Sequence, residues 1–203
     1  MNAKEIALVS VLSALCIVIG YARGIAIPFL PGLVEFMTVI IFVSGFVFGW
    51  HVGALNGAVA LTIYMLVPYP FAHPGAWLFV ISPVLLVVMA GLGALYGFVG
   101  GILGKKRGSQ SITLKFSLEM AFWGLLLTFI YDVVSSIGFY FAYPAYYMSV
   151  WEAIYFTFVP LWLAYPPILH TIVNALIFAF VSPPLIKVIK SLKISIRSDE
   201  TPK

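Results

Sequence analysis

Polar side chains recur at helical spacing inside a segment that is otherwise almost wholly apolar. Thr128, Asp132, Ser135 and Ser136 stand at i, i+4, i+7 and i+8 in and before the stretch FIYDVVSSIG. This spacing places them on one face of a helix. Burying an unpaired carboxylate in hydrocarbon is costly, and ionisable groups within a membrane usually mark ligand or ion pathways. The pattern therefore predicts a polar chamber beside Asp132.

A second polar face follows in the segment PPILHTIVNALIF, where His170 and Asn174 are separated by four residues. At 1.5 Å per residue, Asp132 lies about 30 Å from the start of its helix near Ile112, in the outer third of a bilayer. His170 and Asn174, counted inward from Pro167, come to a similar depth. We expect the two faces to share a cavity. A carboxylate there would favour a cationic or hydroxyl-bearing group, and the many aromatic residues suit a planar heterocycle.

Structural roles for the same residues are the alternative. Asp132 would then pair with Tyr, Ser or His170 to staple two helices, and Asn174 would make an interhelical hydrogen bond. Ser135 or Ser136 with His170 also allows, formally, an intramembrane serine protease, but no oxyanion element accompanies them. The sequence has no phosphate-binding loop, HExxH, GxSxG or closely spaced carboxylate pair, so we expect no enzyme and no metal or cofactor.

The composition predicts an integral membrane protein. The chain has 203 residues, of which 63% are hydrophobic and 9% charged, and its mean hydropathy is +1.10. Membrane spans of about 20 residues would use most of this length, so we expect one membrane domain, 1–203. The single Cys16 excludes a disulfide framework and a Cys-based metal site. Apolar runs bounded by Pro, Gly or charge predict helices at about 3–20, 33–50, 52–68, 77–104, 113–142 and 165–190, with a basic tail at 191–203.

Basic residues predict the orientation. If these six helices all cross the membrane, ten of the eleven Lys and Arg residues lie on one side of it. They are Lys4, Lys105, Lys106, Arg107, Lys115, Lys187, Lys190, Lys193, Arg197 and Lys203. The positive-inside rule makes this side and both termini cytoplasmic, with the first helix retained and not cleaved as a signal peptide. The net charge of +4 is thus a topology signal and indicates no nucleic-acid partner.

The three outer connections are rich in Pro, Tyr, Trp and Phe. The third, YPAYYMSVWEAIYFTFVPLWLAYPP, is long enough to fold back as a short interfacial or re-entrant helix. Alternatively, its aromatic residues form only the belt that sits at lipid headgroups. In these connections His73 and Glu152 either close over a ligand or are simply solvated. Glu35 is expected to pair with Arg23 or to contact a ligand.

Small residues and local charges predict how helices pack. Overlapping GxxxG steps occur at Gly93, Gly97, Gly100, Gly101 and Gly104, and a further series at Gly49, Gly53 and Gly57. They predict close approach of backbones. The first helix has the same small-residue spacing, Ala3 with Ala7 and Ser10 with Ala14, on a surface that could receive a partner. Lys115 and Glu119, at i and i+4, are expected to form a snorkelling pair.

Five segments together resemble a known family. They are IPFLPG, GFVFGWHVGALNGAVALTIYML, GLGALYGFVGGILGKK, TFIYDVVSSIG and PPILHTIVNALIF. The chain resembles, over nearly its whole length, the substrate-binding S component of an energy-coupling factor (ECF) importer. The turn FG...GALNG and the basic stop after GGILGK are the most telling pieces. The resemblance implies an all-α integral membrane protein, a six-transmembrane-helix bundle with both termini cytoplasmic, in the cell membrane of a prokaryote.

The resemblance also implies a function without enzymatic activity. S components capture a scarce vitamin or related small molecule outside the cell, and deliver it by toppling with a membrane coupling (T) subunit and two cytoplasmic ATPase subunits. The elements that contact the ligand in such proteins match Arg23, His73, Trp77, Asp132, Ser135, Trp151, His170 and Asn174 here. A small-residue element on the first helix docks on the coupling subunit. Here it corresponds to Ala7, Ser10 and Ala14, with Ser in place of the usual Ala.

Two other functions stay open on the sequence. A self-sufficient proton-coupled carrier would use Asp132 to bind its proton, and a structural or assembly membrane protein would use the polar residues only to pack helices. The ligand is open as well: riboflavin, thiamine and its pyrimidine precursor, pyridoxine-like compounds and cobalamin all fit the loose chemical criteria.

Overall fold

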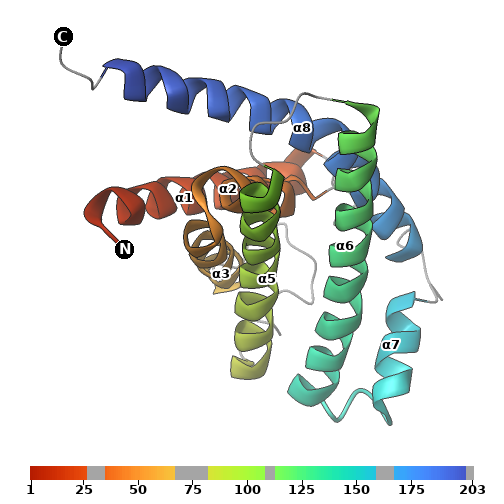
Figure 1. The fold of residues 1–203 in the computed structure, drawn as a ribbon. Coiled ribbons are helices and arrows are strands. Elements are labelled where there is room, and N and C mark those ends of the chain that lie inside the picture. The colour runs from red at the N-terminus through yellow and green to blue at the C-terminus, as the bar shows by residue number, and fades with distance from the viewer. Residues whose placement is uncertain (27–34, 67–81, 108–112, 159–166, 200–203) are drawn as a thin grey trace.

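The computed structural model describes residues 1–26, 35–66, 82–107, 113–158 and 167–199, with the backbone alone for helix residues 23–26, 156–158, 167–168 and 193–199. This part of the chain forms helices without any strand (Figure 1). The helices are α1 (Ala3–Ala26), α2 (Phe36–Phe48), α3 (Trp50–Leu66), α5 (Pro83–Arg107), α6 (Leu114–Ala142), α7 (Val150–Phe158) and α8 (Pro167–Asp199). The expected all-α class is confirmed for these residues.

Four of the helices are long and apolar enough to cross a membrane. These spans are Ala3–Ala22, Pro83–Arg107, Leu114–Ala142 and Leu169–Leu192. The apolar helices α2 and α3 have 13 and 17 residues, which at 1.5 Å per residue is about 20 and 26 Å, shorter than the roughly 30 Å hydrocarbon core. The chain is therefore a multi-pass membrane protein, while a count of six full spans stays a prediction.

Gly49 makes the sharp turn between α2 and α3. Its φ of +100° lies in a region that L side chains rarely adopt, and its N–H donates to the Gly45 carbonyl at 2.8 Å. Because glycine has no Cβ, the chain reverses within a single residue. The two short helices therefore lie side by side, where both contact α5.

The glycines of α5 bring three backbones into direct contact. A Cβ on Gly97 would lie 1.9 Å from the Gly53 carbonyl oxygen, and a Cβ on Gly57 would lie 1.9 Å from that of Gly93. On α2, a Cβ on Gly45 would meet the Gly97 oxygen at 1.9 Å. No side chain larger than hydrogen fits at such distances. The close approach predicted from the GxxxG spacing is thus confirmed.

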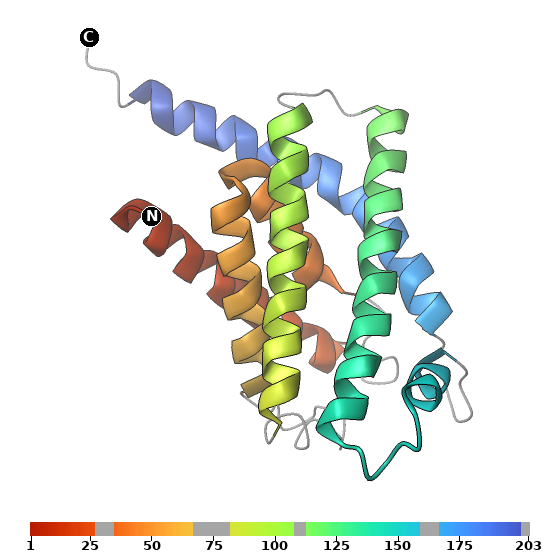
Figure 2. The ribbon, with the colours of Figure 1, turned by 60° about the horizontal axis from the view of Figure 1, so that its bottom comes forward.

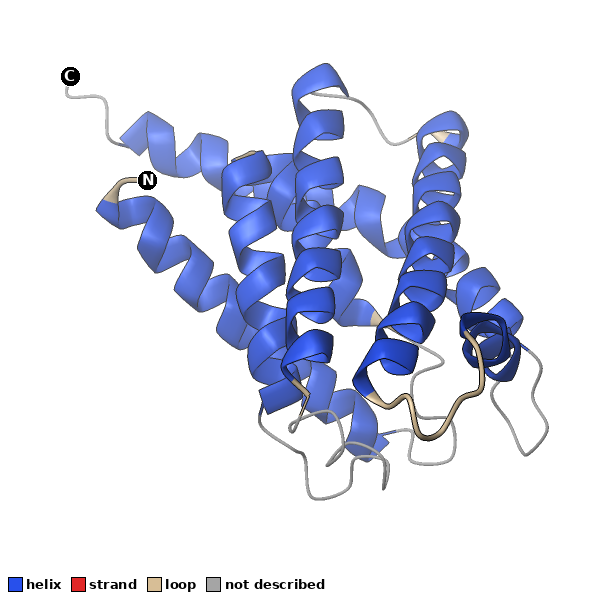
Figure 3. Ribbon diagram, turned by 90° about the horizontal axis from the view of Figure 1, so that it is seen from below, coloured by secondary structure: helices blue, strands red, loops and turns tan. Residues whose placement is uncertain are grey.

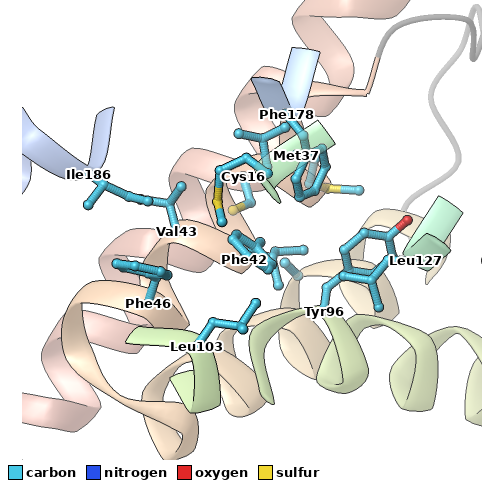
Figure 4. Packing of buried hydrophobic residues seen from close by; sticks show 14 of the residues in the cluster. Cys16, Met37, Phe42, Val43, Phe46, Tyr96, Leu103, Leu127, Phe178 and Ile186 are labelled. Atoms are coloured by element: carbon cyan, nitrogen blue, oxygen red, sulfur yellow. The ribbon is translucent and has the colours of Figure 1, made fainter. Parts of the chain in front are cut away.

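Four aromatic side chains lie among the buried apolar residues at the centre of the bundle, where α8 packs against α2: Phe42, Phe46, Tyr96 and Phe178 (Figure 4). The rings of Phe42 and Phe178 meet edge to face with centroids 5.3 Å apart, and Tyr96 lies beside Phe178. Gly124 on α6 lets α8 come close, because a Cβ there would lie 2.6 Å from the Phe178 Cβ. This core holds α8 against α6, and that contact creates the polar site.

The helix ends gather at two opposite ends of the molecule. Figure 2 shows the end of α5, the start of α6 and the end of α8 toward one end of the molecule, and the end of α6, α7 and the start of α8 toward the other. At the first end, the Arg107 guanidinium pairs with Glu119 at 2.9 Å. Glu119 thus pairs with Arg107, where the sequence predicted Lys115, because the end of α5 packs beside α6 and its guanidinium donates from Nε and Nη2 to one carboxylate oxygen.

The short helix α7 has its own hydrogen-bonded start. The Ser149 hydroxyl accepts from the Glu152 N–H at 3.1 Å, and the Glu152 carboxylate accepts from the Met148 N–H, in the manner of a capping box. A helix within the third connection is therefore confirmed. Glu152 serves to start this helix, a role that the sequence did not predict.

Candidate functional site

The polar stripe of α6 is buried inside the bundle. Thr128, Asp132, Ser135 and Ser136 are all buried, as their shared helical face predicts. Asp132 itself is only 6% exposed. A carboxylate so far from water needs hydrogen-bond donors, and α8 supplies them.

Asp132 binds two consecutive residues of α8. The His170 Nδ1 lies 3.2 Å from one carboxylate oxygen and 3.3 Å from the other, and the Thr171 hydroxyl donates to Oδ2 at 3.2 Å. An imidazole with its proton on Nδ1 would donate to this carboxylate, so the contact joins α6 to α8. Asp132 and His170 thus lie side by side, as both the shared site and the structural pairing of two helices predict, and the shared cavity stays a prediction.

Asn174, one turn further along α8, ties this helix to the start of α2. Its Oδ1 accepts from the Glu35 backbone N–H at 3.0 Å, and the residue is 1% exposed. This bond fixes which way the carboxamide points, because only the oxygen can accept. Its Nδ2 is then a buried donor without a hydrogen-bond partner among the residues that the structure describes.

Tyr96 extends the polar cluster to α5. Its hydroxyl lies 3.2 Å from the Thr128 hydroxyl of α6, and the Glu35, Tyr131 and Asp132 side chains lie near enough to interact with it electrostatically. The site cluster, defined as Glu35, Tyr96, Thr128, Asp132, His170, Thr171 and Asn174, thus joins α2, α5, α6 and α8. The sequence analysis missed Tyr96 and Thr171, although Thr171 follows His170 directly.

Ser135 does not approach the Asp132 carboxylate. Its hydroxyl donates to the backbone oxygen of Asp132 at 3.1 Å, and Ser136 donates to the same oxygen at 2.6 Å. These bonds stay within α6. The His170 Nδ1, which would have to serve as a general base for a serine nucleophile, instead faces the Asp132 carboxylate.

Four other residues were expected to contact the ligand. One lies away from the cluster, and the side chains of the other three are outside the described part of the structure. Trp151 is 79% exposed on α7 and is not brought to the cluster. For Arg23 the structure describes only the backbone, at the end of α1. His73 and Trp77 lie outside the described residues. Their roles, and the Arg23–Glu35 pair, stay predictions.

A second buried polar network lies between α1, α2 and α3. The Asn56 carboxamide accepts from Ser13 at 2.9 Å and donates to Ser44 at 3.0 Å, and Ser44 in turn donates to the Ile41 carbonyl at 2.7 Å. All its side chains are buried. Because this network satisfies itself, it fastens helices and leaves nothing for a ligand.

The expected docking surface is exposed on α1. Ala7, Ser10 and Ala14 all lie on its outer side, where the Ser10 hydroxyl donates only to the Ile6 carbonyl one turn earlier. Within the described part of the chain, no group of three His, Cys, Asp or Glu residues is placed to hold a metal ion. The arrangement around Asp132 is suited to binding, by hydrogen bonds and charge.

Comparison with known proteins agrees with this layout. The family model of the substrate-specific component of ECF transporters matches residues 4–186, which include all of α1 but Ala3 and every residue of the site cluster. No curated protein and no solved structure gave a significant match. A match over most of the chain, to a family of membrane transport proteins, fits the apolar helices and the buried polar site. The chain belongs to the substrate-specific components of ECF transporters.

Proposed function

We propose that the site cluster around Asp132 holds the transported substrate, and that the substrate is a small vitamin-like molecule captured outside the cell. The observation that carries this proposal is the buried Asp132 carboxylate, which His170 and Thr171 meet from the neighbouring helix. A family of substrate-specific components needs a selective polar site within the membrane. This cluster is the one described region where an ionised group and several hydrogen-bonding side chains converge.

The cluster has hydrogen-bonding capacity that its own contacts do not use. An ionised carboxylate offers about four lone-pair positions, of which His170 and Thr171 occupy some. A donor or cation on the substrate would use the rest. The Asn174 Nδ2 would donate to an acceptor atom on the same molecule. A heterocycle with a donor and an acceptor on its edge fits this pattern.

The charge distribution supports access from outside. The cluster lies toward the end of the bundle opposite Lys105, Lys106 and Arg107, because α6 runs from that basic end to its own last turns beyond Asp132 (Figure 2). Basic residues favour the cytoplasmic side. The site then faces the outside of a prokaryotic plasma membrane.

Delivery to the cytoplasm requires partners in this proposal. The membrane coupling subunit would dock on the exposed α1 surface at Ala7, Ser10 and Ala14, and two ATPase subunits would drive the toppling of the loaded component. Few charges face the lipid along the membrane spans, since the exposed residues there are mostly large and apolar. A body with such a surface rotates in a bilayer at low electrostatic cost.

The first test replaces Asp132 by Asn in the purified full-length protein. This change keeps the shape and still accepts from Thr171, but it removes the charge, so we expect the affinity for the molecule that copurifies with the wild type to fall by about 10- to 100-fold. Mass spectrometry identifies that molecule, and calorimetry measures its binding. Ser182→Ala is the matched control, because Ser182 is a buried polar residue of α8 that lies two turns beyond the cluster.

Two results would contradict the proposal. A folded Asp132→Asn protein with wild-type affinity would mean that the substrate binds elsewhere. A variant that fails to fold, together with a wild type that carries no small molecule, would favour the structural role of the Asp132–His170 pair.

A further inference from the structure

One face of α7 is aromatic and exposed. Trp151 and Tyr155, about one turn apart, are 79% and 51% exposed, and Met148, two residues before the helix begins, is 95% exposed. On the other side of the helix Ala153 is 2% exposed, where α7 packs on α6. We call Trp151 and Tyr155 the outer face of α7. The only charged residue in 150–158 is Glu152, and its carboxylate caps the helix.

The position of α7 places this face at the level of lipid headgroups. The 29 residues of α6 extend about 43 Å, more than the roughly 30 Å hydrocarbon core, so the end of α6 reaches the interface. α7 begins eight residues after this end. In Figure 3 α7 is seen end-on while α6 runs lengthwise, so α7 crosses the bundle at an angle and does not extend it.

Exposed apolar residues also occur on the two helices that α7 contacts. Phe141 at the end of α6 and Leu169 at the start of α8 are both exposed, and α7 contacts both helices. In a membrane protein these flanking side chains face lipid. Trp and Tyr carry apolar rings with a polar tip, which is the chemistry that prefers the bilayer interface.

We infer that the outer face of α7 binds the lipid bilayer itself, seated among headgroups and upper acyl chains at the end of the molecule that holds the site cluster. The hydrogen bonds of Ser149 and Glu152 stabilise the start of α7, and the burial of Ala153 on the opposite side of the helix leaves Trp151 facing outward. Trp151 is therefore a lipid anchor and not a substrate contact. This inference is independent of which substrate the protein carries.

Spin labels on α7 test the inference directly. Cys16 is the only cysteine and is buried, so single labels can be attached in Trp151→Cys and Tyr155→Cys variants of the full chain in phosphatidylcholine liposomes. We expect both labels to relax faster with oxygen, which concentrates in lipid, than with a water-soluble nickel chelate. The matched control is Ala153→Cys, which should be shielded from both reagents because it faces α6.

Fluorescence of the unlabelled protein gives a second measurement that needs no cysteine. The difference in emission between wild type and Trp151→Phe reports Trp151, and lipids brominated near the headgroup should quench it while aqueous iodide should not. Quenching by iodide with faster relaxation by nickel would show a water-facing helix and overturn the inference. Shielding from lipid and water reagents alike would show a protein partner on this face, which also overturns it.

Discussion

Two buried polar side chains of this protein differ in how much of their hydrogen-bonding capacity the protein itself uses. The Asn56 carboxamide receives from Ser13 and gives to Ser44, so its network closes on itself. The Asp132 carboxylate, with His170 and Thr171, keeps capacity to accept from another molecule. The difference separates a polar group that fastens helices from one that is suited to bind cargo.

The closed network predicts a stability effect without a binding effect. Asn56→Leu leaves the Ser13 and Ser44 hydroxyls without this buried partner, so we expect the free energy of unfolding to fall by about 1–3 kcal/mol. Thermal unfolding in detergent measures the loss. Ser10→Ala is the control, because that exposed hydroxyl bonds only within α1. A stable Asn56→Leu protein that has lost its substrate would instead assign Asn56 to the binding site.

Thr171 offers a test that separates its hydroxyl from its shape. Thr171→Val keeps the volume but removes the donor to Asp132 Oδ2, which should weaken substrate binding by about 3- to 10-fold, since a neutral donor to a charged group contributes about 1 kcal/mol or more. Thr171→Ser should restore most of the affinity because it returns the hydroxyl. Equal affinity of the Val and Ser variants, measured by calorimetry, would show that this bond does not shape the site.

At the level of helices, the glycines decide which surfaces meet. Gly97 and Gly91 belong to the same helix, α5, yet a Cβ on Gly97 would lie 1.9 Å from the Gly53 oxygen while one on Gly91 would meet nothing within 4 Å. GxxxG spacing indicates that some glycines make contact. It does not identify which face of α5 turns toward α3, because this depends on the rotation of the whole helix.

Alanine at these two positions should have opposite effects. Gly97→Ala forces α3 and α5 apart and should lower the free energy of unfolding by about 1–3 kcal/mol. Gly91→Ala on the open side should leave stability unchanged or raise it slightly, because alanine favours helix. Thermal unfolding of the two purified variants checks this. Equal effects would mean that the contact between α3 and α5 is looser than the backbone distances imply.

Local patterns predicted most helices but not their ends. The sixth helix was expected to end near 190, and α8 continues to Asp199 through Pro183 and Pro184. Prolines inside membrane helices are tolerated where neighbouring groups compensate for the lost hydrogen bonds. The expected fourth helix, 77–104, begins at Pro83 in the structure, since proline fits best in the first turn of a helix.

At the scale of the whole molecule, the proposed docking of the coupling subunit on α1 predicts that a substitution there abolishes assembly but leaves substrate binding intact. Ala7→Trp fills the exposed small-residue surface of α1, so the purified protein should still bind substrate but should no longer copurify with the coupling subunit. Leu15→Trp is the control, because Leu15 is a large exposed residue of the same helix outside the Ala7, Ser10, Ala14 surface. Normal assembly of the Ala7→Trp protein would place the docking surface elsewhere.

Reconstitution distinguishes the importer subunit from a self-sufficient carrier. Liposomes that contain this chain alone should bind substrate but not accumulate it, whereas liposomes with the coupling subunit and both ATPases should accumulate it when ATP is inside. Accumulation by the chain alone under a proton gradient would replace the proposal with a proton-coupled carrier that uses Asp132.

The sequence by itself determined the membrane class, most of the helices and the residues that share a polar face, because hydropathy and the 3.6-residue period are local properties of the chain. It also placed Asp132 and His170 at one depth, since helix rise converts residue number into distance. Only the tertiary structure decided that Thr171 joins them, that Asn174 binds the start of α2 and that Trp151 turns outward. Those contacts depend on how each helix is rotated and shifted against its neighbours, and this is set by the packing of glycines and aromatic rings throughout the bundle.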